Sequence, residues 1–252
     1  MYSINGNDPE ADICIIHYSL FTIHYSLKEQ VMELKGTNEA RKMQRLIQNM
    51  IYCIITREKS MDKRKKMNRN LDISELDRAK WQGHRLEFRY IAYNYYDVEI
   101  NNENDNILVS FIKKPFNEPF EKKPDDTDVL FQPWWDDVKA WGIIKNDKLI
   151  AVIETAVEEW SNRLIVTELW VDDAHRRKGI ATALMDIAMN RAKEEKRRVL
   201  MLETQSCNEG AITFYLQYGF SLIGFDTCAY DNNDIERKEV RMNMGIKLDV
   251  TM

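Results

Sequence analysis

Cysteine and histidine are both scarce in this 252-residue chain, with four of each. No two of the cysteines form a C-x-x-C pair, so neither a structural zinc site nor a disulfide framework is indicated. We therefore expect no metal. Reduced cysteines are the ordinary state in the cytosol, and we interpret the chain as a cytoplasmic protein.

Long apolar runs and an excess of basic residues are also missing. The most apolar early stretch, from Ile13 to Leu27, is too short to cross a bilayer. Acidic residues precede it where a secretory signal would carry basic ones, so we expect no targeting signal and no membrane association. The net charge of −5 argues against a dedicated nucleic-acid-binding protein.

Glycine and proline are few and unevenly placed. Five of the nine glycines lie at or after Gly179, and four of the five prolines lie between Pro115 and Pro133. We expect residues 1–70 to be an N-terminal extension, disordered or partly helical, and residues 71–252 to form the folded domain. The extension repeats the pentapeptide IHYSL, and its segment 57–69 carries a net charge of +5. That segment is interpreted as a solvated linker or as a nucleic-acid or membrane-surface patch. A true start at Met61 or Met67 is a further hypothesis.

Apolar residues after residue 140 alternate between strand and helix periods. They predict strands near 141–144, 148–157, 163–171, 199–203, 221–225 and 240–246, and helices over 179–195 and 209–218. Upstream we expect a helix within 71–83, strands over 88–100 and 108–112, and a proline-rich loop over 113–137. This order predicts a mixed α/β sheet with helices covering its faces.

The richest chemical signal lies where the strand 163–171 is followed by a helix. Three cations, Arg176, Arg177 and Lys178, directly precede Gly179. Backbone N–H groups at such a helix start converge on one point, and the helix dipole adds positive potential there, as a pyrophosphate requires. The spacing is neither a Walker A loop nor G-x-G-x-x-G. Taken alone, the pattern is equally compatible with a basic loop that caps a helix.

A second signal follows in residues 200–220, LMLETQSCNEGAITFYLQYGF, which place Asn208 before a helix and Tyr215 on it. Together with R-x-x-G-x-A at residues 176–181, the chain resembles the GNAT superfamily of acetyl-CoA-dependent N-acetyltransferases over roughly residues 141–248. The runs WSNR at 160–163, LETQ at 202–205 and GFDT at 224–227, followed by Tyr230, are similar to the streptothricin acetyltransferase branch. Two departures stand out: Ala181 replaces the usual last glycine, and only Glu168 is kept of the branch's acidic I-E-D stretch.

The resemblance implies a GNAT-like α/β (α+β) fold, in which a mixed, centrally splayed sheet is flanked by helices. It also implies acetyl-CoA as co-substrate and no metal. A bulge in the central strand would free backbone N–H groups near residues 169–171 for the thioester oxygen. The residues expected to bind acetyl-CoA are Leu169, Trp170, Val171, Arg176, Arg177, Lys178, Gly179, Ile180, Ala181, Thr182, Asn208 and Tyr215.

Two proton transfers are required, because the attacking amine must lose a proton and the departing thiolate must gain one. By the resemblance, Tyr215 is the candidate acid. Glu168, a carboxylate within an apolar strand, is the candidate base, and Glu203 is the alternative. The structural alternatives are a packed aromatic residue for Tyr215 and a glutamate on the solvent face of the sheet for Glu168.

The expected acceptor is the primary amine of a small cationic compound, with streptothricin-like antibiotics, and hence antibiotic resistance, heading the list. Tryptophan faces attract cations, and carboxylates attract ammonium groups. The candidate substrate-binding residues are Trp134, Trp135, Asp226 and Tyr230. The two tryptophans could instead belong to a surface loop or anchor the core.

Several other functions stay open. Within the same fold, the chain could acetylate protein N-termini or lysines, or it could hold acyl-CoA as a non-catalytic sensor. A nucleic-acid-associated role through residues 57–69 is a further alternative. We expect a monomer or a homodimer.

Overall fold

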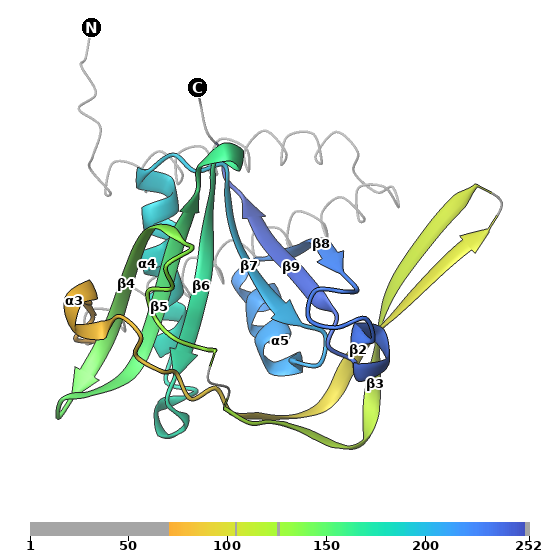
Figure 1. Cartoon of the computed structure of the whole chain (residues 1–252), viewed down its shortest axis with the longest axis horizontal. Helices are drawn as coiled ribbons and strands as arrows, with labels where there is room; N and C mark the ends of the chain where they lie inside the picture. The colour runs from red at the N-terminus through yellow and green to blue at the C-terminus, as the bar shows by residue number, and fades with distance from the viewer. Residues whose placement is uncertain (1–70, 104, 125–126, 250–252) are drawn as a thin grey trace, which may run out of the picture. The chain divides into compact units, whose positions relative to one another are not determined.

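The computed structural model describes residues 71–103, 105–124 and 127–249 (Figure 1). The predicted N-terminal extension, including its repeated pentapeptide and its basic segment, lies outside the described residues, so the expected domain boundary stays a prediction. Among the helices of the described part, none is long and apolar enough to cross a membrane.

Seven strands form one sheet in the order β1-β4-β5-β6-β7-β9-β8, and β2 and β3 form a separate two-stranded ribbon. The strands are β1 (Ser74–Glu75), β2 (Tyr90–Glu103), β3 (Asn106–Lys122), β4 (Asp136–Lys145), β5 (Lys148–Glu158), β6 (Arg163–Val171), β7 (Val199–Gln205), β8 (Ser221–Asp226) and β9 (Arg241–Lys247). The α-helices are α3 (Arg78–Trp81), α4 (Ile180–Glu194), α5 (Glu209–Tyr218) and α6 (Asp234–Arg237), with short 3-10 turns η1 (Glu159–Ser161) and η2 (Asp173–His175).

The order of strands and helices predicted after residue 140 is confirmed. β6 covers the predicted residues 163–171, and α4 and α5 differ from their predicted ranges by at most one residue at each end. The hairpin between β4 and β5 turns at Asn146 and Asp147, both with positive φ (49° and 59°). Asparagine and aspartate tolerate this conformation, which suits a tight hairpin turn.

Upstream of β4 the predictions are partly wrong. The helix expected within 71–83 is present only as the short helix α3. It begins after Asp77, whose side chain accepts a hydrogen bond from the N–H of Ala79 (3.0 Å). The predicted proline-rich loop is a strand up to Lys122, so β3 contains Pro115 and Pro119. Proline is tolerated there because both strands of a two-stranded ribbon are edge strands, and half of their N–H groups need no partner.

The centre of the sheet is splayed, as expected. β6 and β7 are parallel, but they pair only from Arg163↔Val199 to Val166↔Leu202 and then separate (Figure 1). On its other side β6 carries a bulge, because the register with β5 shifts between Glu154 and Thr155. This bulge inserts Thr167 as an extra residue and increases the local twist, which opens a gap between β6 and β7.

One apolar core joins the helices to the sheet. Leu164 and Leu200 are cross-strand partners and therefore point to the same face, where they meet Leu184 of α4 and Ile212 of α5. A second, smaller core covers the opposite face with Trp81, Leu86, Leu130 and Phe131. Burial of each large apolar side chain contributes about 1.5–3 kcal/mol, so these two cores hold the splayed sheet together.

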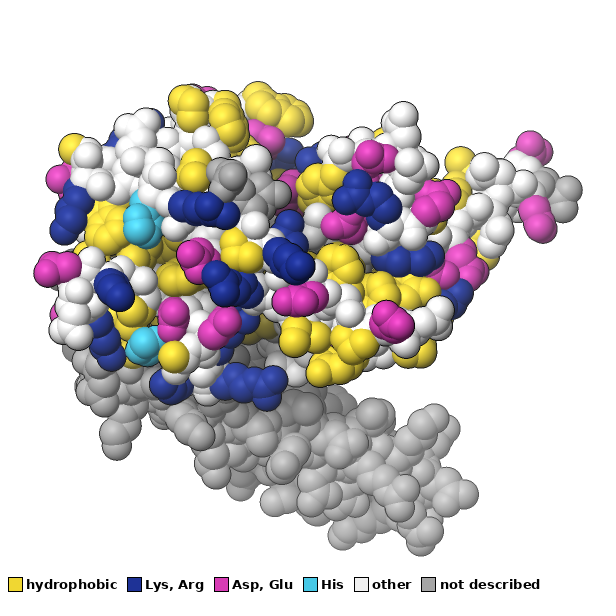
Figure 2. All heavy atoms as spheres, turned by 60° about the horizontal axis from the view of Figure 1, so that its bottom comes forward, with side chains coloured by type: hydrophobic (Ala, Val, Ile, Leu, Met, Phe, Trp, Pro, Cys, Tyr) yellow, Lys and Arg dark blue, Asp and Glu magenta, His cyan; other side chains and the backbone are white. Residues whose placement is uncertain are grey.

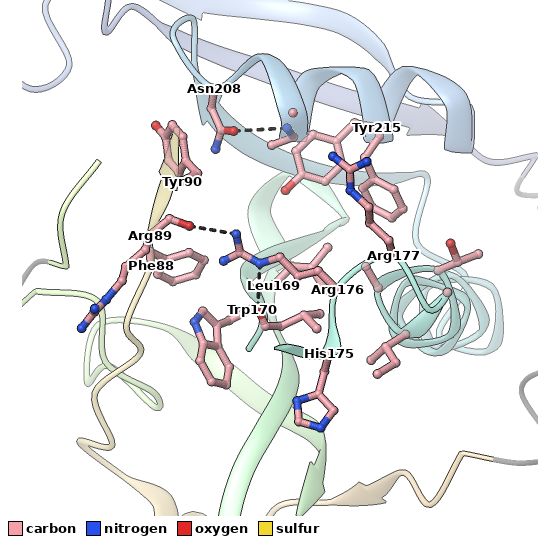
Figure 3. A pocket seen from close by; sticks show the side chains of 18 of the residues that line it. Phe88, Arg89, Tyr90, Leu169, Trp170, His175, Arg176, Arg177, Asn208 and Tyr215 are labelled. Atoms are coloured by element: carbon pink, nitrogen blue, oxygen red, sulfur yellow. Dashed lines mark hydrogen bonds between the residues drawn. The ribbon is translucent and has the colours of Figure 1, made fainter. Parts of the chain in front are cut away.

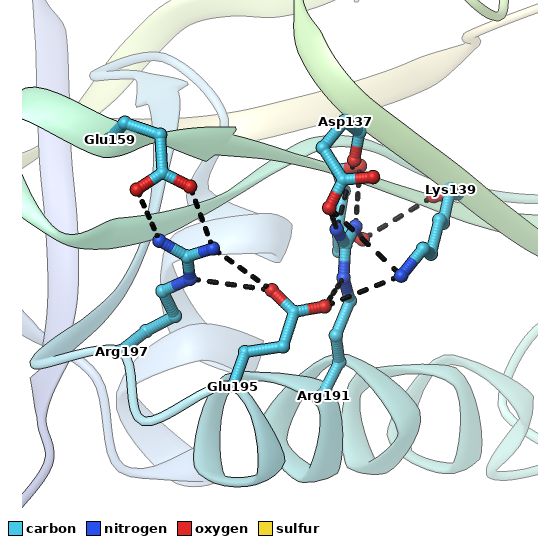
Figure 4. A network of polar contacts seen from close by, with 7 residues as sticks. Asp137, Lys139, Glu159, Arg191, Glu195 and Arg197 are labelled. Carbon is cyan, nitrogen blue, oxygen red and sulfur yellow. Dashed lines mark hydrogen bonds and ion pairs between the residues drawn. The ribbon is translucent and has the colours of Figure 1, made fainter.

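A polar network fixes the C-terminal end of α4 to β4 and β5 (Figure 4). The Arg191 guanidinium is 5% exposed, and it donates to Thr155 Oγ1 (2.8 Å), Asp137 Oδ2 (2.6 Å) and Glu195 Oε1 (2.7 Å). Arg197 adds a two-pronged ion pair with Glu159, with both distances 3.0 Å. A buried arginine requires such complete pairing, because an unpaired buried charge is strongly destabilising.

The base of the β2–β3 ribbon is attached to the start of α5. The N–H of Tyr96 donates to the carbonyl of Ser206 (2.9 Å), and Asn94 Nδ2 donates to Glu209 Oε2 (2.9 Å). Asp97 binds both Lys114 (2.7 Å) and Lys238 (2.9 Å). On the face shown in Figure 2, acidic and basic side chains are interspersed with apolar ones.

Candidate active site

A cavity of about 590 Å³ lies beside the point where β6 and β7 separate (Figure 3). Four segments line it: the end of β6, the loop and first turn of α4, one side of α5, and the chain that leads into β2. The lining includes most of the residues predicted to bind acetyl-CoA, namely Leu169, Trp170, Val171, Arg176, Arg177, Gly179, Ile180, Ala181, Thr182, Asn208 and Tyr215.

The loop before α4 leaves the start of this helix without a cap. Asp172 accepts a hydrogen bond from the N–H of Ala174 (3.1 Å), which closes the η2 turn. Arg177 and Gly179 then have positive φ (59° and 76°), and Gly179 is the N-cap with no side-chain acceptor. The N–H groups of the first turn therefore face the cavity without an intrahelical partner, which is an arrangement suited to a phosphate group.

The three cations of this loop have different surroundings. Arg176 supports the loop, because its guanidinium donates to the carbonyls of Val171 (3.0 Å) and Arg89 (2.9 Å) and pairs with Asp173 (2.7 Å). Lys178 Nζ donates to the carbonyl of Ala174 (2.8 Å). The Arg177 guanidinium, in contrast, has no hydrogen bond or ion pair with any other described residue, and it extends toward α5 (Figure 3). Arg177 is thus the cation of this loop that is available to a ligand.

The cavity side of β6 has an open backbone edge. Leu169, Trp170 and Val171 pair with Ile153, Val152 and Ala151 of β5, whereas within the described part no strand pairs with their opposite edge. This edge faces the gap, although the Val171 carbonyl already accepts a hydrogen bond from Arg176, and the bulge at Thr167 lies two residues before Leu169. An extended ligand could pair with this edge in the manner of an added strand.

Asn208 and Tyr215 lie on the α5 side of the same cavity. Asn208 is the N-cap of α5, and its Oδ1 accepts a hydrogen bond from the N–H of Ala211 (3.2 Å). Tyr215 is 9% exposed, and its hydroxyl points into the cavity (Figure 3). Burial, followed by the charge of Glu168, raises the pKa of Tyr215, so its hydroxyl stays protonated at neutral pH.

Glu168 reaches the gap from the face of the sheet opposite α4. Its cross-strand partner is Glu154, and its carboxyl group has no hydrogen bond to another described residue. Burial raises the pKa of Glu168 well above its ordinary value, and the carboxylates of Asp128, Glu154 and Glu203 raise it further. A carboxylate with a raised pKa is a stronger base, and the protonated Tyr215 lies across the gap from it. Glu203, the alternative base, binds Arg241 instead (3.3 Å).

The four residues predicted to bind the acceptor lie outside this cavity lining. Trp134 is 66% exposed, and Trp135 is half-buried in the segment after Phe131. Asp226 binds Arg241 (3.4 Å), and the Tyr230 side chain is partly exposed. Tyr230, like Asp226, lies near Arg241, whose charge acts on it.

Sequence reasoning missed the wall of the cavity formed by Phe88, Arg89, Tyr90 and Ile91. These residues lead into β2, far from the other lining residues in the chain. Arg89 contributes its backbone carbonyl, which accepts from Arg176, so the residue type carries no signal of this role. Across the described ranges, no group of three or more histidine, cysteine or acidic side chains is arranged to hold a metal ion.

Comparisons with known proteins agree with this geometry. Residues 106–220 match the model of the acetyltransferase (GNAT) family. Streptothricin acetyltransferase A of Bacillus subtilis (strain 168) is 29% identical over 129 residues, which are 51% of this chain and 74% of the relative. A crystal structure of nourseothricin acetyltransferase superposes with a TM-score of 0.55 and 24% identity, covering 70% of this chain and 98% of that one.

A second solved structure shares the fold to the same degree. It is a protein of Bacillus anthracis str. Ames, assigned as a streptothricin acetyltransferase and crystallised with acetyl coenzyme A, with a TM-score of 0.55 and 21% identity. It covers 70% of this chain and 97% of its own. The family match over residues 106–220, these relatives and the splayed sheet with an open helix start beside it together show a GNAT-type acetyltransferase fold.

Proposed function

We propose that the protein transfers the acetyl group of acetyl-CoA to a primary amine of a small cationic compound of the streptothricin type. One observation carries this proposal: beside the gap between β6 and β7, an uncapped helix start with a free arginine lies near a protonated tyrosine and a carboxyl group with a raised pKa. The names of the relatives support the acceptor class, and the acetyl coenzyme A in one of them supports the donor.

The acetyl-CoA side would use the cavity described above. The N–H groups of the first turn of α4 and the Arg177 guanidinium would bind the phosphates. The free edge of Leu169–Val171 would pair with the extended pantetheine amides, and the Asn208 amide nitrogen, which has no partner among the described residues, would donate to one of them. Arg176 and Lys178 would hold the loop in shape, in keeping with their contacts to backbone carbonyls.

The chemical step would divide between two residues. Glu168 would accept a proton from the amine, directly or through a water, as the amine nitrogen forms its bond to the acetyl carbon. Tyr215 would donate its hydroxyl proton to the sulfur as the carbon–sulfur bond breaks. The raised pKa of Glu168 makes it the better proton acceptor, and the raised pKa of Tyr215 keeps the hydroxyl proton available.

The acceptor side would lie on the face of the sheet from which Glu168 approaches. The carboxylates of Asp128 and Glu203 both raise the pKa of Glu168, so this approach is acidic and favours a cation. Trp134, Trp135, Asp226 and Tyr230 would contribute at its rim, with the tryptophans supplying apolar faces to a cationic substrate.

The direct test is an acetyl-transfer assay with a panel of amines that includes streptothricin, polyamines, aminoglycosides and N-terminal peptides. We expect turnover with streptothricin, and expression in a sensitive bacterium should confer resistance to it. Turnover only with N-terminal or lysine peptides would instead support protein acetylation. Tight acetyl-CoA binding without turnover of any amine would support a sensor and contradict the proposal.

The role of Tyr215 can be tested on the same assay. We expect Tyr215→Phe to lower kcat by about 100-fold, since general acid catalysis contributes about 10²–10⁴-fold. The acetyl-CoA Kd, measured by calorimetry, should change little because the ring stays in place. Phe214→Leu, a change to the neighbouring aromatic residue, is the control for altered packing. An unchanged kcat in Tyr215→Phe would exclude Tyr215 as the acid.

A further inference from the structure

Glu154 is a buried carboxyl group to which the proposed reaction gives no role. It lies in β5, between β4 and β6, and its side chain is 0% exposed. It does not line the cavity. Acidic side chains are rarely buried to this extent unless they are paired, so the surroundings of Glu154 require an explanation.

Both Glu154 oxygens accept hydrogen bonds from residues at which the backbone is irregular. Oε1 accepts a hydrogen bond from the Thr167 hydroxyl (2.9 Å), and Thr167 is the extra residue of the β6 bulge. Oε2 accepts from the N–H of Phe131 (2.6 Å), a residue with a φ of 59°. Positive φ is unfavourable for phenylalanine, and this hydrogen bond stabilises it. One side chain therefore ties the bulge before the gap to the start of the segment that carries Trp134 and Trp135.

Glu154 is also the closest partner of Glu168 in the sheet. The two residues are opposite each other in β5 and β6, and they point to the same face. The charged or titratable groups that act on Glu168 are Asp128, Glu154 and Glu203, with Tyr215 across the gap. Burial raises the pKa of Glu154 itself, and the two hydrogen-bond donors and the charge of Arg78 of α3 oppose that rise in part.

Hydrogen bonding alone does not require a charge at this position. A glutamine could accept from Phe131 N–H with its oxygen and donate to the Thr167 hydroxyl with its nitrogen, because that hydroxyl can both donate and accept. A neutral amide would also avoid repulsion between two neighbouring buried carboxyl groups. The presence of a glutamate therefore needs a reason beyond the fold, and Glu168 is the group that its charge affects.

We propose that Glu154 is a positioning residue for the transfer reaction, which fixes the β6 bulge and the Phe131 turn around the gap and uses its negative charge to make Glu168 a stronger base. The proposal rests on the function proposed above, in which Glu168 accepts the proton of the amine. Glu154 itself touches no substrate, and it acts through Glu168.

The test compares Glu154→Gln with the full-length wild-type protein. Selective ¹³C labelling of glutamate allows the Glu168 carboxyl to be titrated by NMR, with no substrate required. Removing the neighbouring charge should move the titration midpoint of Glu168 to lower pH. The acid limb of the plot of kcat against pH should move with it. Since a weaker base transfers the proton less effectively, the kcat plateau should fall by about two- to tenfold.

Two further variants separate charge from structure. Thr167→Val removes the hydroxyl but keeps the Glu154 charge, so it should reduce kcat without moving the Glu168 midpoint to lower pH. Glu118→Gln removes an exposed carboxylate on β3 and should change neither measurement. The Glu154→Gln protein should unfold at the same temperature as wild type or higher.

The outcomes distinguish this proposal from the proposed function. An unchanged Glu168 midpoint in Glu154→Gln would overturn it, and so would loss of the fold, because the amide can make both hydrogen bonds. A lowered midpoint in a protein that acetylates no amine would keep the influence of Glu154 on Glu168 but overturn its link to the reaction. The same result would also refute the proposed function. An unchanged midpoint in a protein that acetylates amines would leave the proposed function intact.

Discussion

The two ends of α4 use arginine for opposite purposes. At the C-terminal end, Arg191 is buried and donates to a hydroxyl, two carboxylates and the carbonyls of Thr155 and Asp137 (Figure 4). At the N-terminal end, Arg177 lines the cavity and has no partner among the described residues (Figure 3). Both positions are basic in the sequence, and only the surroundings distinguish them.

This difference shows how the fold separates stability from binding along one helix. A fully paired arginine stabilises the native state only through partners that the fold supplies. An unpaired arginine beside uncapped N–H groups contributes little to folding, but it can bind an anion when one arrives. A substitution at the C-terminal end of α4 should therefore reduce stability and leave acetyl-CoA binding intact, and one at Arg177 should do the reverse.

The largest effect is expected at Arg191. Arg191→Ala leaves the Asp137 and Glu195 carboxylates without their buried partner, and such losses cost about 3–5 kcal/mol in the free energy of unfolding. Urea denaturation of the variant and of Lys193→Ala, an exposed change on the same helix, would measure this. If the folded variant lost acetyl-CoA affinity as strongly as stability, the two ends of α4 would not be independent.

A smaller effect is expected at Arg177, and it should concern acetyl-CoA binding and not stability. Removing one charge-assisted contact to a phosphate should raise the acetyl-CoA Kd about tenfold, or about 1.4 kcal/mol, without changing the free energy of unfolding. Calorimetric titration would give the Kd. Arg177→Lys, which keeps the charge, should lose less. Equal affinity in Arg177→Ala and wild type would show that this arginine does not bind the cofactor.

The smallest effect on acetyl-CoA affinity is expected at Gly179. Gly179→Ala places a side chain on a residue with a φ of 76°, which costs about 1–2 kcal/mol of stability. It also puts a methyl group beside the uncapped N–H groups, so the acetyl-CoA Kd should rise several-fold. Gly83→Ala is a matched control, because Gly83 has the same φ and lies outside the cavity. It should reproduce the loss of stability with unchanged affinity.

Local patterns were sufficient for most of the fold after residue 140. The apolar run of β6 and the helical period of α4 are properties of short segments, and both were predicted nearly to the residue. The sequence predicts the start of the second ribbon strand at 108–112 but not its continuation to Lys122, because prolines usually indicate a loop. Pro115 and Pro119 are acceptable in β3 only because it pairs on one side, which no local pattern reveals.

The candidate site shows the same division. The Arg176–Gly179 loop could be recognised from its residue types, and Asn208 and Tyr215 from the family resemblance, and the structure brings them around one cavity. The wall at Phe88–Ile91 could not, since it depends on backbone atoms placed by distant contacts. Arg176 is a further example: its charge suggested a ligand contact, whereas its hydrogen bonds go to Val171 and Arg89.

By itself, the sequence determined the order of the main strands and helices in the C-terminal part and the residue types around a helix start suited to an anion. Both follow from hydrophobic period, turn residues and helix-terminus chemistry, which act over a few residues. Only the tertiary structure decided which arginine is free, how β6 and β7 separate, and why Glu154 lies beside Glu168. These depend on contacts between residues distant in the chain, where burial and neighbouring charges set the properties of each group.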